Sequence, residues 1–219
     1  MEDEDKNSGK DRIRNEGQKR EGGITELNSF TFAILDCDII VIKNYLEQQD
    51  IYKYRISYEN IDVESFYFDN MYLQPIKGTA KGLFYNPVIA PNFTIVLGNG
   101  WGCWGSLCNN IASNLLINNI QIQINDDDEN PDQMRNQIVM REGAETIRVV
   151  QMLLGDNNKM EFVQVGTPLW FENIEYYKKR KIKDRMNKNI LMEYSAKIGL
   201  DLTDNNLFKS NQKSLYVEL

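Results

Sequence analysis

The chain has 219 residues, of which 42% are hydrophobic and 26% are charged, so it is long enough and apolar enough to form a hydrophobic core. It contains no histidine, which excludes Ser-His-Asp and Cys-His hydrolases, HExxH metalloproteases and histidine-containing zinc sites within the chain. The formal net charge of −7 disfavours binding of duplex nucleic acid by the whole domain and suits a basic partner.

The N-terminal region differs in composition from the rest of the chain. Thirteen of residues 1–23 are charged and only two are apolar, which predicts a disordered tail. Residues 24–219 are predicted to form a single α+β domain. The tail has no apolar segment of the kind found in secretory signals, and no stretch reaches the ~18 consecutive apolar residues of a membrane span. We therefore expect a cytoplasmic protein.

The first half of the domain is predicted to contain strands and one short helix. Residues 30–35 are almost uniformly apolar, which is typical of a buried strand, and residues 38–48 carry apolar side chains at helical spacing. Interleaved aromatic and polar residues predict antiparallel strands at 55–58 and 65–68. Prolines and glycines between 75 and 91 predict loops and short edge strands.

The middle of the chain is predicted to be a strand, a glycine-rich loop, a helix and a second strand. Residues 92–97 are expected to form the first strand, and residues 98–105 the loop. The helix is predicted to run from a cap at Ser106 to about Leu116. Alternation of glutamine and isoleucine at 121–124 indicates the second strand.

A series of hairpins is predicted next. An acidic turn at residues 126–131 precedes apolar segments at 137–141, 146–154 and 161–165, which we interpret as strands. The glycine- and asparagine-rich residues 155–158 are typical of a hairpin connection between the last two strands.

The C-terminal part of the chain is predicted to be helical. From Phe171 to Ile198 apolar residues recur at helical spacing, which indicates one long amphipathic helix or two shorter ones with Gly199 just beyond the end. Trp170 and Phe171 are expected to anchor this segment to the sheet, and residues 215–217 to add an edge strand. The predicted fold is α+β, a mostly antiparallel sheet with one middle helix and a C-terminal amphipathic helical segment packed on it.

The glycine-rich loop supports three interpretations. Gly100, Gly102 and Gly105 have the GxGxxG spacing of dinucleotide-binding loops, and Asp126 follows at the distance of the acid that binds the ribose. Two bulky tryptophans beside the glycines and the hairpins predicted after Asp126 argue against dinucleotide binding, because a doubly wound fold needs crossover helices. The other interpretations are a tight turn whose tryptophans pack in the core, and a recognition surface with tryptophan anchors.

The cysteines, the basic run and the acidic turn are each interpreted as structural features. Cys37, Cys103 and Cys108 are too few for a four-cysteine zinc site and are expected to be small buried residues. The basic run at residues 178–185 is interpreted as the solvated face of a helix, with an acidic partner or nucleic acid as alternatives. The acidic turn that begins at Asp126 lacks the glycine and glutamate of an EF-hand loop and is interpreted as solvated.

Taken together, these features lead us to expect a non-enzymatic domain that binds another protein, one specific form being an immunity or antitoxin-type inhibitor of a basic toxin. We assign no catalytic residue, metal ligand or cofactor, and neither nucleic acid nor a membrane is expected as a partner. The alternatives are a nucleotide-binding or enzymatic domain that uses residues 98–105, and a structural subunit of a larger assembly. The predicted partner-binding residues lie on the glycine loop and the acidic turn: Asn99, Trp101, Trp104, Asp126, Asp127 and Asp128.

Overall fold

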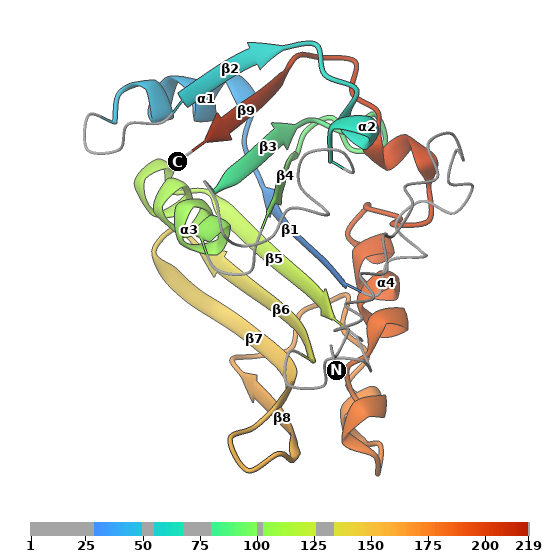
Figure 1. Cartoon of the computed structure of the whole chain (residues 1–219). Helices are drawn as coiled ribbons and strands as arrows, with labels where there is room; N and C mark the ends of the chain where they lie inside the picture. Colours follow the sequence, from blue (N-terminus) through green and yellow to red (C-terminus); the bar gives the residue numbers. More distant parts are fainter. Residues whose placement is uncertain (1–28, 50–54, 68–79, 100–102, 126–133, 219) are drawn as a thin grey trace, which may run out of the picture.

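The structure, a computed structural model, is a curved antiparallel sheet with helices on both faces (Figure 1). Nine strands in the described residues form one sheet in the order β2-β9-β3-β4-β1-β5-β6-β7-β8, and each neighbouring pair is antiparallel. The fold is therefore α+β, as predicted. The predicted tail and the acidic turn lie outside the described residues, which are 29–49, 55–67, 80–99, 103–125 and 134–218.

The strands and helices have the following bounds, given in chain order. The strands are β1 Ser29–Leu35, β2 Arg55–Glu59, β3 Lys81–Tyr85, β4 Thr94–Gly98, β5 Asn118–Asn125, β6 Arg135–Glu142, β7 Glu145–Leu154, β8 Met160–Val165 and β9 Ser214–Glu218. The α-helices are α1 Ile39–Glu47, α2 Val63–Tyr67, α3 Cys103–Leu115 and α4 Lys188–Lys197, and the 3₁₀ turns are η4 Tyr176–Lys178, η5 Ile182–Asp184 and η6 Asn205–Phe208. None of the described helices has the length and apolar character needed to cross a membrane.

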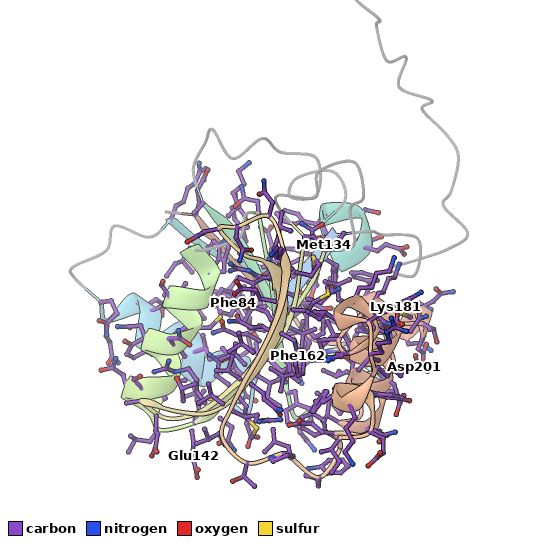
Figure 2. The ribbon with its side chains drawn as sticks, turned by 90° about the horizontal axis from the view of Figure 1, so that it is seen from below. Phe84, Met134, Glu142, Phe162, Lys181 and Asp201 are labelled. Atoms are coloured by element: carbon purple, nitrogen blue, oxygen red, sulfur yellow. The ribbon has the colours of Figure 1, made fainter. Side chains whose placement is uncertain are left out.

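Strand β1 shows how the sheet divides the core into two halves. Phe30, Phe32 and Ile34 face the half that α2, α4 and η6 cover, whereas Ala33 and Leu35 face the half that α1 and α3 cover. Figure 2 shows the sheet between α3 and the C-terminal helices. Because both faces of β1 are buried, its sequence is an almost continuous apolar run.

Local sequence signals set the ends of the principal helices. The Asp38 side chain accepts a hydrogen bond of 2.7 Å from the Ile40 amide and caps α1, and Asn187 accepts one of 3.1 Å from Ile190 and caps α4. Gly199 follows α4 with a φ of 95°, a left-handed conformation that favours glycine. The predicted position of this glycine just beyond the helix is confirmed.

Strands β6, β7 and β8 form the predicted meander. In the β7–β8 connection the Gly155 amide donates a 2.9 Å hydrogen bond to the Lys159 carbonyl, and Asn158 adopts a φ of 56°, which asparagine tolerates better than most residues. A register shift between Met140 and Arg141 leaves Ile147 of β7 without a paired residue and marks a bulge in β7.

The strand predicted at residues 65–68 is wrong, because residues 63–67 form the short helix α2. Asp62 accepts a hydrogen bond of 3.2 Å from the Ser65 amide, and its carbonyl accepts one from Phe66. Val63 and Tyr67, one helical turn apart, are the buried residues. Capping and this four-residue spacing outweigh the short aromatic alternation that indicated a strand.

Two further expectations are corrected by the sheet. Strand β9 lies between β2 and β3, and β3 lies between β9 and β4, so neither is the predicted edge strand. In the C-terminal segment only residues 188–197 form an α-helix, and the preceding residues form η4 and η5. A continuous helix would place Lys179 beside Lys183 and Lys181 beside Arg185, and like charges at this spacing destabilise a helix.

Candidate functional sites

The predicted partner-binding residues differ in where they lie. Trp104 is only 5% exposed and lies in the core between the sheet and α3. Asn99 is half-buried, and its side chain accepts a 2.6 Å hydrogen bond from the Lys81 amide, which ties the start of the glycine loop to β3. Trp101 and the aspartates of the acidic turn, Asp126, Asp127 and Asp128, lie outside the described residues.

Trp104 lies against a pair of glycines on adjacent strands. Gly82 of β3 and Gly98 of β4 are paired in register, and a Cβ atom at either position would collide with the indole ring. The six-membered ring of the indole lies over Gly82 and its pyrrole ring lies over Gly98. The Gly98–Trp104 arrangement is therefore a packing motif, with glycine required for close approach of the indole to the sheet.

A small polar cavity borders this packing motif, and we call it the amide cavity. Its volume is about 40 Å³, and it lies between the first turn of α3 and the middle of the sheet. The pyrrole side of Trp104 and the backbone of Gly98 form one wall. The polar side chains that line it come from β1, β5 and β6: Thr31, Gln121, Gln123 and Gln137.

The exposed tryptophan of the described chain is Trp170. Its side chain is 78% exposed, so the expectation that it anchors the C-terminal segment in the core is wrong, whereas the neighbouring Phe171 is 2% exposed and fulfils that role. Trp170 borders an apolar pocket of about 240 Å³, which we call the Trp170 pocket. Other residues that line the pocket are Ile34, Asp36, Phe93, Ile120, Met140 and Ile198.

A buried ion pair holds the turn that carries Trp170. Glu172 Oε2 lies 2.6 Å from Arg148 Nη2, and the two side chains are 0% and 1% exposed. Glu172 Oε1 also accepts hydrogen bonds from Arg148 Nε at 2.8 Å and from the Leu169 amide at 2.9 Å. Arg148 Nη1 donates to the carbonyls of Val165 and Gly166. These contacts attach both the entrance and the exit of the Trp170 turn to β7.

Two tyrosines complete the network around this ion pair. The Tyr177 hydroxyl donates to Glu172 Oε2 at 2.7 Å, and Tyr194 donates to Tyr177 at 3.2 Å. Burial acts to raise the pKa of Glu172, but hydrogen bonds from Arg148, Leu169 and Tyr177 outweigh it and hold this pKa below its usual range. Burial also acts to lower the pKa of Arg148, but its contacts with Glu172 raise it. The pair is therefore ionised across the neutral range.

The described thiols have the character of structural cysteines. Cys108 is fully buried in α3, and burial raises its pKa to about 12. Burial, followed by the charges of Asp38 and Asp36, raises the pKa of Cys37. Neither thiol has the lowered pKa of a nucleophile, and in the described residues no group of three or more cysteine or carboxylate side chains is arranged to hold a metal ion.

The basic run lies on the two 3₁₀ turns rather than on a helix face. Arg180, Lys181 and Lys183 are exposed, and Lys181 lies on the outer side of the C-terminal segment, away from the sheet (Figure 2). Lys178 pairs with Glu175 at 2.6 Å. The run is therefore solvated, as predicted, although its backbone differs from the prediction.

The glycine loop does not lie in a doubly wound unit. Strands β4 and β5, which precede and follow α3, each pair antiparallel with β1 between them. Comparisons of the chain with protein-family models, with curated proteins and with solved structures found no match. The functions of the Trp170 pocket and the amide cavity are therefore inferred from the geometry of this chain.

Both sites were missed by the sequence analysis, although each left a signal. Gln121 and Gln123 alternate with isoleucines that enter the other half of the core, and polar residues inside a sheet covered on both faces indicate a specialised site. For Trp170 the signal is the neighbouring Pro168 and Gly166, which indicate a turn and hence a surface position.

Proposed function

We propose that this protein is a protein-binding domain that acts by recognition rather than by catalysis, and that the Trp170 pocket is its recognition site. The observation that carries the proposal is a large aromatic side chain, 78% exposed, at the border of an apolar pocket. Tryptophan is among the residues most enriched at the energetic centres of protein interfaces. A partner protein would cover the exposed indole together with the apolar surface beside it.

The size of the pocket favours a large apolar side chain as the group it receives. Its volume of about 240 Å³ exceeds the ~150 Å³ of an apolar cavity that accommodates benzene. Ile34, Ile120 and Met140 line the pocket from the neighbouring strands β1, β5 and β6. We therefore assign an aromatic or long aliphatic side chain of a partner protein to this pocket.

The negative charge beside the pocket favours a partner that carries a basic residue next to that apolar side chain. Asp36 is exposed and is the one ionisable residue among the described residues that line the pocket. The chain also carries a net charge of −7, which attracts a basic partner at long range. An immunity-type inhibitor that covers a basic toxin is the specific form of this proposal, and the same two charge observations support it.

The turn that carries Trp170 is fixed by contacts within this chain. Arg148 and Glu172 attach it to β7, and Phe171 packs at 5.8 Å from Tyr194, between ring centres. Lys197 Nζ donates to the Phe171 carbonyl at 3.2 Å. A tryptophan on a fixed turn loses little conformational entropy on binding, which favours a recognition role.

The test compares capture of host proteins by the wild-type chain, by Trp170→Ala and by Val41→Ala. Val41 is a matched control, because it is a partly exposed apolar residue on α1, on the opposite face of the sheet. A captured protein supports the proposal only if Trp170→Ala loses it and Val41→Ala retains it. With the purified partner, Trp170→Ala is expected to weaken binding by about 30-fold, the effect of an interface centre worth about 2 kcal/mol.

The charge part of the proposal has its own variant. Asp36→Asn is expected to weaken association and to reduce its dependence on salt, because it removes the charge beside the pocket. If Trp170→Ala and the wild type hold the same partner equally well, or if the chain associates only with copies of itself, the proposal is wrong. Sedimentation at several concentrations identifies the second case.

A further inference from the structure

A row of uncharged polar side chains crosses the sheet beneath α3. Thr31 of β1 pairs with Gln123 of β5, and Gln123 pairs with Gln137 of β6. Residues directly opposite one another on antiparallel strands project to the same face. Here that face is the one covered by α3, because Phe30, Phe32 and the isoleucines of β5 occupy the other. All three side chains line the amide cavity.

These side chains have hydrogen-bonding capacity that the protein does not use. Gln123 is 4% exposed, yet its carboxamide makes no hydrogen bond with any described residue, and the same holds for the side chains of Thr31 and Gln137. By contrast, Gln121 donates to the Asn109 side chain at 2.8 Å and to the Gly105 carbonyl at 3.2 Å, so it is fixed to α3. Thr31 and Gln137 are half-buried, and the polar atoms of all three side chains reach the solvent-accessible space of the cavity. Their hydrogen-bonding capacity is therefore open to a ligand that enters it.

A second, independent group at the cavity also lacks a partner. Trp104 Nε1 is buried and has no hydrogen-bond acceptor among the described residues. The pyrrole ring that carries this N–H group lies over Gly98, and both Trp104 and Gly98 line the cavity. The unpaired N–H group of Trp104 therefore lies at one wall of the cavity, and Gln123 and Gln137 supply donors and acceptors on its floor.

We propose that the amide cavity binds a neutral carboxamide group. No charged side chain is among the described residues that line it, so a carboxylate or an ammonium group would lose its hydration without gaining a counter-charge from them. A group that both accepts and donates is required to satisfy an indole N–H together with glutamine carboxamides. The cavity of about 40 Å³ has room for about three water-sized groups, which matches the three heavy atoms of a carboxamide.

The carboxamide oxygen accepts from Trp104 Nε1, and its NH₂ group donates to a side-chain oxygen of the floor. The cyclic pairing of two carboxamides, one N–H···O bond in each direction, is available with Gln123 or Gln137. Such a group is supplied either by a free small amide or by an asparagine or glutamine side chain of a polypeptide. This site is separate from the Trp170 pocket, which lies on the other face of the sheet, and the inference does not depend on the proposed function.

The experiment follows the indole N–H signals in a two-dimensional NMR spectrum. The chain has three tryptophans, and the variant Trp104→Phe identifies the signal of Trp104. Titration with propionamide is expected to shift this signal downfield in a saturable way, because the N–H gains an acceptor. Propionate, which has nearly the same shape but carries a charge, is expected to leave the signal in place.

Two further probes distinguish the sources of the carboxamide. N-acetylglutamine methylamide represents a glutamine within a polypeptide, and free L-glutamine represents a small-molecule ligand. Tighter binding of the blocked compound assigns the cavity to a polypeptide side chain, and tighter binding of the free amino acid assigns it to a metabolite. Either result supports the proposed carboxamide chemistry.

Matched variants show whether the shift arises in this cavity. Gln123→Met keeps the length of the side chain and removes its hydrogen bonds, and it is expected to weaken propionamide binding about tenfold. Gln137→Met provides a second variant of the same kind. Gln151→Met is the control, because Gln151 continues the row as the partner of Gln137 but does not line the cavity. The proposal is overturned, and the cavity is solvent-filled, if no neutral amide moves the Trp104 signal or if propionate moves it equally. The same conclusion follows if the signal responds unchanged in Gln123→Met and Gln137→Met.

Discussion

Replacing Glu172 with glutamine is expected to destabilise the protein strongly at neutral pH. The substitution removes the negative charge that faces Arg148, whose side chain is 1% exposed. It also replaces one of two oxygens by an NH₂ group, which points a donor at Arg148 or at the Tyr177 hydroxyl. A buried charge that loses its partner costs about 3–5 kcal/mol, and two lost charge-assisted hydrogen bonds give a similar total.

The assay is urea-induced unfolding of the wild type, of Glu172→Gln, and of a double-mutant cycle made of Glu172→Leu, Arg148→Met and the double variant Arg148→Met/Glu172→Leu. Each single variant leaves one charge or several polar groups buried without a partner, whereas the double variant removes both charges and fills the space with apolar atoms. The double variant is therefore expected to lose less stability than the sum of the two single changes, with a coupling energy of about 2 kcal/mol or more.

The pH dependence follows from the lowered pKa of Glu172 in the folded state. A carboxyl group of this kind contributes stability that is fully present above its unfolded pKa and is lost as the pH falls through its folded pKa. The stability difference between the wild type and Glu172→Gln is therefore expected to be constant near neutral pH and to shrink below about pH 4.

These experiments can contradict the role given to the ion pair. If either single variant loses less than about 1 kcal/mol, or if the two effects are additive, the pair does not hold the Trp170 turn to β7. The indole N–H signal of Trp170 gives a separate check. It is expected to broaden or move in Glu172→Gln at pH 7, because Arg148, Tyr177 and the Leu169 amide then share one remaining oxygen.

Three other predictions concern packing and chemistry elsewhere. Gly98→Ala is expected to cost about 1–3 kcal/mol in denaturant unfolding, because its methyl group meets the indole of Trp104, and equal stability of variant and wild type would contradict this packing. Leu116→Gly is expected to gain about 0.5–1 kcal/mol, since Leu116 is 82% exposed and has a φ of 55°. Leu115→Gly, at the last residue of α3, is expected to lose more than this, because Leu115 packs against the core. Cys108 is expected to react with a thiol reagent at pH 8 only after unfolding, as measured by mass spectrometry; rapid labelling of the native protein would disprove its burial.

Much of the fold is visible in local sequence patterns. Strand β1, helix α1 and the β7–β8 hairpin were predicted close to their observed bounds, because each is specified by apolar spacing, a cap or turn residues within about ten positions. Gly199 illustrates the strongest kind of signal. The end of α4 requires a left-handed φ at this position, and this conformation has a low energy only for glycine.

The errors occurred where two local patterns compete. Residues 63–67 contain aromatic alternation and also a capped turn with Val63 and Tyr67 on one side, and only packing against the sheet selects the helix. Residues 176–184 have helical apolar spacing but a dense run of like charges. For β3 and β9, their place inside the sheet depends on pairing between strands more than a hundred residues apart, which no local pattern reports.

The sequence by itself determined the composition limits, the α+β class, most strands and the helix caps, because these depend on neighbours along the chain. Tertiary structure alone decided that Trp104 is buried over two glycines while Trp170 is exposed, since both are tryptophans beside glycine or proline in the sequence. It also decided that Arg148 meets Glu172 and that three polar side chains from three strands share one cavity. Burial and partnership are properties of surfaces brought together by folding, and both candidate sites of this protein depend on them.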